Sequence, residues 1–122
     1  MANKKIVIAA GGTGGHLYPA QALAQQLKKE IPPHHILFVA GGLKSNRHFD
    51  RENFPFQEIA GSPLISRNPF KALKGLKNLI KGFSQSVAVL KKFNPELVVG
   101  FGSFYAVPVL LAAKWLKIPI VL

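Results

Sequence analysis

The chain has 122 residues, of which 48% are hydrophobic, and this length allows one domain with a substantial core. Its formal net charge of +11 predicts an anionic partner: a nucleic acid, an anionic lipid surface or a phosphorylated substrate. The absence of cysteine excludes disulfides and thiolate metal sites and is typical of a cytoplasmic protein. We expect no membrane-spanning segment and no signal peptide, because no apolar run has the necessary length or flanking pattern.

The first half of the chain alternates apolar strands with helical patterns. Residues 4–10 form a continuous, β-branched apolar run, which predicts a strand buried on both faces. After a glycine-rich turn, a helix is expected to open at Tyr18 and to continue to about Glu30, with Leu23 and Leu27 facing inward. Four further segments are expected: a strand at 36–40, a short polar helix at 45–52, a strand at 54–59 and a loop at 61–68.

The second half repeats the alternation. Residues 69–93 form a long helical pattern that Gly75 and Gly82 weaken. A strand at 97–99, an apolar helix at 104–116 and a strand at 117–122 follow. Strands that alternate with helices predict the α/β class: a Rossmann-like open parallel sheet with flanking helices and right-handed crossovers.

Two of the predicted strands lead into glycines and then into a helix, at residues 11–16 and 100–103. Such a turn directs free backbone N–H groups and the positive end of the helix dipole at an anion. Ligands of open α/β sheets lie at the carboxyl ends of the strands, so both turns are expected to flank one crevice. The alternative is that the glycines only allow close helix packing. Neither turn contains the third glycine of a dinucleotide fingerprint or the lysine of a Walker loop.

The segment from Gly11 to His16, followed by Pro19, resembles the MurG family of N-acetylglucosaminyltransferases. The later residues 100–104 and Pro108 strengthen this resemblance, although Ser103 stands where many members have glycine. Members are two-domain GT-B glycosyltransferases with the active site between two Rossmann-like domains. Residues 1–122 resemble only the N-terminal domain, which binds the acceptor and the membrane. The donor-binding domain is therefore expected to lie in a continuation of the chain or in a partner chain.

The resemblance implies transfer of N-acetylglucosamine from UDP-GlcNAc to undecaprenyl-pyrophosphoryl-MurNAc-pentapeptide, the lipid I to lipid II step of peptidoglycan synthesis. It implies a peripheral enzyme on the cytoplasmic face of the plasma membrane, with no cofactor and no metal. A related or split two-chain transferase with another polyprenyl-lipid acceptor remains an alternative. A non-catalytic basic module that binds nucleic acid is another, although the aromatic residues do not form an interleaved stacking platform.

His16 is the candidate catalytic base, because it follows the glycines at the start of a helix whose dipole favours a neutral ring. The alternatives are a capping histidine and one that only orients the ligand. The glycines and Thr13 can offer N–H groups and a hydroxyl to a phosphate. The candidate substrate-binding residues are Gly12, Thr13, Gly14, Gly15, Gly100, Gly102, Ser103 and Phe104. His34, His35 and His48 have no ligand spacing and are interpreted as surface residues.

The long helix at 69–93 is amphipathic and basic. At about 100° per residue, one face carries Leu73, Leu76, Leu79, Ile80, Phe83, Val87 and Leu90, and another carries Lys71, Lys74, Lys77, Lys81 and Lys92. An ordinary helix with a solvated lysine face fits the C-terminal half. For the first half, contact with an anionic membrane is an equal alternative. The candidate membrane contacts are Phe70, Leu73, Lys74, Lys77, Lys81 and Trp115.

Overall fold

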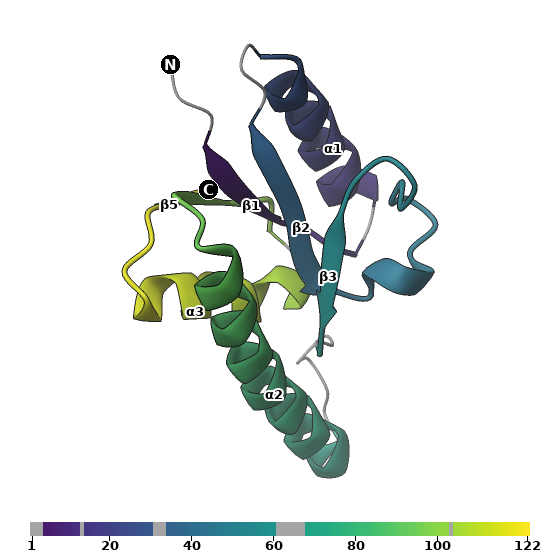
Figure 1. The fold of residues 1–122 in the computed structure, drawn as a ribbon. Coiled ribbons are helices and arrows are strands. Elements are labelled where there is room, and N and C mark those ends of the chain that lie inside the picture. Colours follow the sequence, from purple (N-terminus) through teal and green to yellow (C-terminus); the bar gives the residue numbers. More distant parts are fainter. Residues whose placement is uncertain (1–3, 13, 31–33, 61–67, 103) are drawn as a thin grey trace.

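The computed structural model describes residues 4–12, 14–30, 34–60, 68–102 and 104–122. Within these residues, parallel strands form one five-stranded sheet in the order β3-β2-β1-β4-β5 (Figure 1). The strands are β1 (Lys5–Ala9), β2 (His35–Gly41), β3 (Phe56–Ile59), β4 (Leu97–Gly100) and β5 (Ile120–Val121). The helices are α1 (Gly14–Lys29), α2 (Pro69–Phe93) and α3 (Val107–Trp115), with 3₁₀ turns η1 (Leu43–Ser45) and η2 (Phe104–Ala106). The predicted α/β class with a Rossmann-like parallel sheet is confirmed.

Alternation along the central strand divides the core into two layers. Ile6, Ile8 and Ala10 pack with β2 and α1 on one face of the sheet. Val7 and Ala9 pack with α2 and α3 on the other face, and Figure 1 shows these two helices crossing there. Because both faces are covered, the apolar run of β1 has no polar alternation.

The bounds of α2 agree with the predicted 69–93, because local signals set both ends. The side-chain oxygen of Asn68 accepts a hydrogen bond from the Phe70 N–H at 2.9 Å, and Pro69 occupies the first turn. At the other end Asn94 adopts the left-handed conformation with φ of 55°.

The inward face of α2 is formed by glycine in its first half, which corrects the predicted apolar face there, whereas in the second half Leu90 is buried and Phe83 and Val87 pack against the core as predicted. Gly75, Gly82, Ser86 and Leu90 are its buried residues. At Gly82 an added Cβ would lie 2.0 Å from the carbonyl oxygen of Ala60, so glycine allows the helix to approach the end of β3. The larger side chains of the first half consequently point away from the sheet.

Two other expected segments differ from the structure. The expected helix at 104–116 is divided into η2 and α3, because Pro108 lies in the first turn of α3, where its missing N–H costs nothing. The last strand is limited to β5, since Lys117 has a φ of 60° and Pro119 lacks an N–H. The expected loop at 61–68 lies outside the described residues except for Asn68. No helix in the described part of the chain has the length and apolarity needed to cross a membrane.

Candidate functional site

The helix after the first glycine turn begins at Gly14, four residues before the predicted start at Tyr18. Glycine disfavours a helix by roughly 1 kcal/mol relative to alanine, but this glycine allows a close tertiary contact. A Cβ on Gly14 would lie 2.7 Å from Cε2 of Tyr18 and 3.2 Å from Nδ1 of His48. Gly15 and His16 therefore lie in the first turn, whose N–H groups have no partner within the helix. Pro19 lies inside α1 and not at its start.

His16 connects the two glycine turns. Its Nδ1 lies 2.6 Å from the carbonyl oxygen of Phe101, across 85 residues of sequence. A carbonyl oxygen can only accept, so Nδ1 carries the hydrogen and Nε2 has the free lone pair. The turns after β1 and β4 are thus side by side at the carboxyl edge of the sheet, because β1 and β4 are paired neighbours.

The glycines of the second turn have different roles. Gly102 has a φ of 79°, and a Cβ there would lie 3.1 Å from Cε1 of His16. A side chain at this position would be strained and would crowd the histidine. A Cβ on Gly100 would instead lie 2.9 Å from the side chains of Leu110 and Leu122. Close packing thus suffices to explain Gly100, whereas Gly102 belongs to the surroundings of His16.

The structure adds a third turn, after β2, that sequence reasoning left out of the site. A cavity of about 410 Å³ is lined by Gly12, Gly41, Gly42, Ser45, Asn46 and Tyr105. The side-chain amide of Asn46 donates to the carbonyl oxygen of Gly12 at 2.7 Å. Asn46 therefore holds the first glycine turn in place. The glycine pair directly after the second strand was the signal in the sequence for this turn.

The same bonds explain why the polar helix expected at 45–52 is wrong. Oδ1 of Asn46 accepts from the backbone N–H of His48 at 2.8 Å, and Oε1 of Gln21 accepts from that of Asp50 at 2.7 Å. Backbone N–H groups that donate to side chains are not available for the i to i−4 hydrogen bonds of an α-helix. The residues after η1 therefore form turns, and the Gln21 side chain of α1 holds these turns through its hydrogen bonds.

The other candidate residues and the other histidines lie in different parts of the chain. Thr13 and Ser103 lie outside the described residues, and Phe104 begins η2. Among the histidines, His35 is exposed as predicted. His34 lies partly buried at the surface, with a side chain that is 11% exposed and contacts Glu30. The described residues contain no group of three or more histidines or acids that could hold a metal ion.

The first half of α2 and the end of α3 expose large apolar side chains. Phe70 is 83% exposed, Leu73 62% and Trp115 72%. Lys74, Lys77 and Lys81 are exposed on the same half of α2. Trp115 reaches α2 through an edge-on contact with Phe83, with ring centroids 6.4 Å apart. We call these residues the basic–apolar surface: Phe70, Leu73, Lys74, Lys77, Lys81 and Trp115.

Known proteins resemble the chain in sequence and in fold. It is 61% identical over 120 residues to the UDP-N-acetylglucosamine–N-acetylmuramyl-(pentapeptide) pyrophosphoryl-undecaprenol N-acetylglucosamine transferase of Protochlamydia amoebophila, covering 98% of this chain and 32% of that enzyme. The crystal structure of MurG from Acinetobacter baumannii superposes with a TM-score of 0.71 at 30% identity, covering 96% of this chain and 32% of that one.

The Streptomyces glycosyltransferase SsfS6 has a TM-score of 0.64 at 17% identity, covering 97% of this chain and 38% of that one, which shows a common fold. The fold is thus the Rossmann-like half of a GT-B glycosyltransferase, and the resemblance to the N-terminal part of MurG is confirmed. Residues 6–122 match the N-terminal domain of glycosyltransferase family 28, and the chain belongs to that family.

Proposed function

We propose that the chain is the acceptor-binding part of a transferase that moves N-acetylglucosamine from UDP-GlcNAc to undecaprenyl-pyrophosphoryl-MurNAc-pentapeptide. The observation that carries the proposal is the bond between His16 and the Phe101 carbonyl, which joins two glycine turns at one edge of the sheet. The sequence relative from Protochlamydia is named for the same reaction. The chain spans 32% of that relative's length, so residues 1–122 supply one wall of the active site. A continuation of the chain or a partner chain would supply the donor-binding wall.

The acceptor pyrophosphate binds at the start of α1 in this proposal. The N–H groups of Gly14, Gly15 and His16 are unpaired within the helix and carry the positive end of its dipole. The Asn46 side chain fixes the position of the adjoining Gly12 carbonyl, and with it the backbone at that point of the first glycine turn. Backbone donors that are fixed before the ligand arrives need no reorganisation when it binds.

His16 acts as the general base. An acceptor hydroxyl attacks the anomeric carbon of N-acetylglucosamine, the bond from that carbon to the UDP oxygen breaks, and UDP leaves with the electron pair. The configuration at this carbon is inverted, and the hydroxyl proton passes to Nε2 of His16. The bond from Nδ1 to the Phe101 carbonyl fixes the tautomer and the direction of Nε2. The step requires no metal ion and no cofactor.

The test is transfer of labelled N-acetylglucosamine by the complete enzyme, meaning this chain together with its donor-binding part. We expect the label on the MurNAc-pentapeptide lipid. Label on a different polyprenyl-linked sugar would instead favour the related or split transferase.

We also propose that the basic–apolar surface binds the cytoplasmic face of the plasma membrane, where a polyprenyl-linked acceptor resides. Large exposed apolar side chains surrounded by lysines suit the interface of an anionic bilayer. Changing Lys74→Glu together with Lys77→Glu should weaken binding to anionic vesicles by at least about 30-fold, since each lysine near such a surface contributes about 1 kcal/mol. Vesicle co-sedimentation at several salt concentrations measures this binding.

The matched control is Lys91→Glu with Lys92→Glu, two exposed lysines at the other end of the same helix. This control should retain most of the binding. Equal binding of the unmodified protein to neutral and anionic vesicles would contradict the membrane proposal. Tight binding to random oligonucleotides without binding to vesicles would favour a nucleic-acid module.

A further inference from the structure

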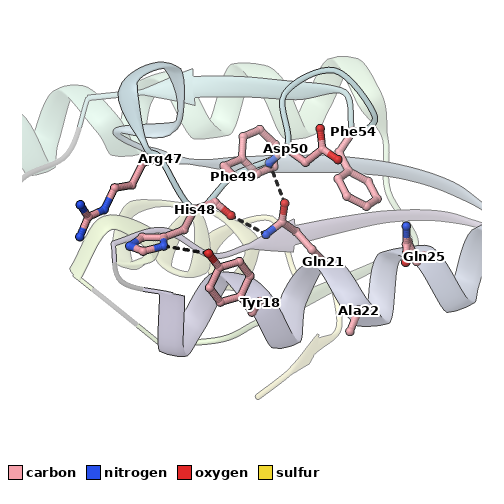
Figure 2. A pocket seen from close by; sticks show the side chains of 9 residues that line it. All are labelled: Tyr18, Gln21, Ala22, Gln25, Arg47, His48, Phe49, Asp50 and Phe54. Carbon is pink, nitrogen blue, oxygen red and sulfur yellow. Dashed lines mark hydrogen bonds between the residues drawn. The ribbon is translucent and has the colours of Figure 1, made fainter.

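A second cavity lies beside the glycine turn, between α1 and the segment that follows η1. Its volume is about 420 Å³, within the range of ligand-binding sites. One wall is the face of α1 that carries Tyr18, Gln21 and Gln25, and residues 47–50 with Phe54 form the other wall (Figure 2). The proposed transfer reaction assigns no role to this cavity.

The walls of the cavity are held in place by the protein itself. Nε2 of Gln21 donates to the carbonyl oxygen of His48 at 2.7 Å, and Oε1 accepts from the N–H of Asp50 at 2.7 Å (Figure 2). Phe49 and Phe54 are buried, with exposures of 4% and 3%, and anchor the segment in the core. The cavity is thus formed before any ligand binds, which lowers the entropic cost of binding.

One end of the cavity adjoins the start of α1. The rings of Tyr18 and His48 stand against Gly14, the first residue of the helix, and the Tyr18 hydroxyl lies 3.2 Å from Nδ1 of His48. A ligand with a phosphate at the helix start can therefore extend directly into the cavity. The seven-residue spacing from Tyr18 to Gln25 corresponds to about 10 Å along the helix, and about three extended peptide residues have that length.

The polar groups of the cavity suit a peptide that carries a carboxylate. Figure 2 shows Arg47 beside His48 at one end of the lining, with its guanidinium directed away from Tyr18, and Asp50 nearer the other end, where Gln25 lies. Within the described part of the chain, neither the Arg47 guanidinium nor the Gln25 amide has a hydrogen-bond partner. A guanidinium binds a carboxylate through two parallel hydrogen bonds. Oδ2 of Asp50 accepts from Nδ2 of Asn53 at 2.6 Å, and its charge disfavours a second carboxylate at that end.

We propose that this cavity binds the peptide attached to the acceptor sugar, and that Arg47 binds a carboxylate of that peptide. The inference rests on the proposed function, which supplies a peptide-bearing acceptor. An acceptor pyrophosphate would offer Arg47 a similar anion, so the experiment has to distinguish the two sources of negative charge. Acceptors with and without the peptide make this distinction, because both retain the pyrophosphate.

The experiment compares Arg47→Gln with Arg47→Lys in the complete enzyme, using a MurNAc-pentapeptide lipid and the same lipid without its peptide. With the peptide present, Arg47→Gln should lower kcat/KM by about tenfold, mainly through KM, because the glutamine amide can keep one of the two hydrogen bonds and loses the other. Arg47→Lys should lose less, because the charge remains. Without the peptide, neither variant should differ from the unmodified enzyme. Lys44→Gln, at an exposed cation in the preceding turn η1 and outside the cavity, is the matched control and should behave as the unmodified enzyme.

Equal losses for both acceptors would assign Arg47 to the pyrophosphate and overturn the inference. Equal kcat/KM of the unmodified enzyme for both acceptors would overturn it as well, since the peptide would then not be recognised. In both cases transfer itself persists and the proposed function stands. Absence of transfer to either acceptor would contradict the proposed function and, with it, the role of the cavity.

Discussion

Replacing His16 with alanine is expected to lower kcat of the complete enzyme by about 10²- to 10⁴-fold, the usual contribution of a positioned general base. The ring is held by its Nδ1 hydrogen bond to the Phe101 carbonyl, so Nε2 is the nitrogen that receives the proton. KM for the acceptor should change less than kcat, because proton transfer occurs in the transition state. Steady-state kinetics with UDP-GlcNAc and the lipid acceptor measure both constants.

The variant His16→Asn separates the catalytic role of the His16 ring from its structural role. An asparagine amide can still donate to the Phe101 carbonyl but cannot accept the proton at the position of Nε2. This variant should keep the thermal midpoint of the parent protein and lose kcat as the alanine variant does. His35→Ala, at an exposed histidine, is the matched control and should be fully active. If kcat of His16→Ala lay within a few-fold of the parent value, His16 would not be the general base.

Gly82→Ala is expected to destabilise the domain by about 2 to 3 kcal/mol, at the upper end of typical overpacking costs. The added Cβ would lie 2.0 Å from the carbonyl oxygen of Ala60 and 3.2 Å from Cβ of Pro108, so α2 would have to move away from the sheet. Helix propensity alone predicts the opposite sign, because alanine is favoured over glycine by about 1 kcal/mol. Whether Gly82→Ala lowers or raises the free energy of unfolding therefore shows whether overpacking or helix propensity has the larger effect.

Chemical denaturation of the Gly82 variant measures the free energy of unfolding. The matched control is Ser84→Ala, at an exposed position of the same helix, and its effect should stay within about 0.5 kcal/mol. Stability of Gly82→Ala at or above that of the parent protein would contradict the close packing of α2 on the end of β3.

The elements that sequence reasoning located best are those whose signals are local. Both ends of α2 are marked by neighbouring residues, with Asn68 and Pro69 at the start and Asn94 at the end. The start of α1 was misplaced because local propensity argues against Gly14 and Gly15 in a helix. Both glycines nevertheless lie in α1, and at Gly14 an added Cβ would lie within 3.2 Å of the side chains of Tyr18 and His48, a crowding that propensity does not register.

The buried face of α2 illustrates a second limit. Apolar periodicity placed Leu73, Leu76 and Ile80 on the same face as Leu90, yet these three side chains are 62%, 49% and 62% exposed whereas Leu90 is 1% exposed. Periodicity counts hydrophobic side chains and does not register that a helix can pack through its glycines. Gly75 and Gly82 were regarded as weaknesses of the helix, whereas they lie on its inward face.

The candidate site was predicted in part. The two glycine turns lie together as expected, and the contact between His16 and Phe101 supplies a geometric reason that no local pattern contains. Asn46 was missed because the sequence predicted a polar helix over 45–52 and gave no role to its side chains. Its role depends on a bond to Gly12, 34 residues away in the sequence.

The most direct measurement is transfer of labelled N-acetylglucosamine by the complete enzyme to two acceptors that differ only in the linkage of sugar to lipid. One has a pyrophosphate and the other a single phosphate. If the start of α1 binds the pyrophosphate, kcat/KM for the monophosphate acceptor should be lower by about 100-fold, since about two charge-assisted hydrogen bonds are lost. Equal kcat/KM for the two acceptors, or no transfer to either, would contradict the assignment of the glycine turns to the acceptor pyrophosphate.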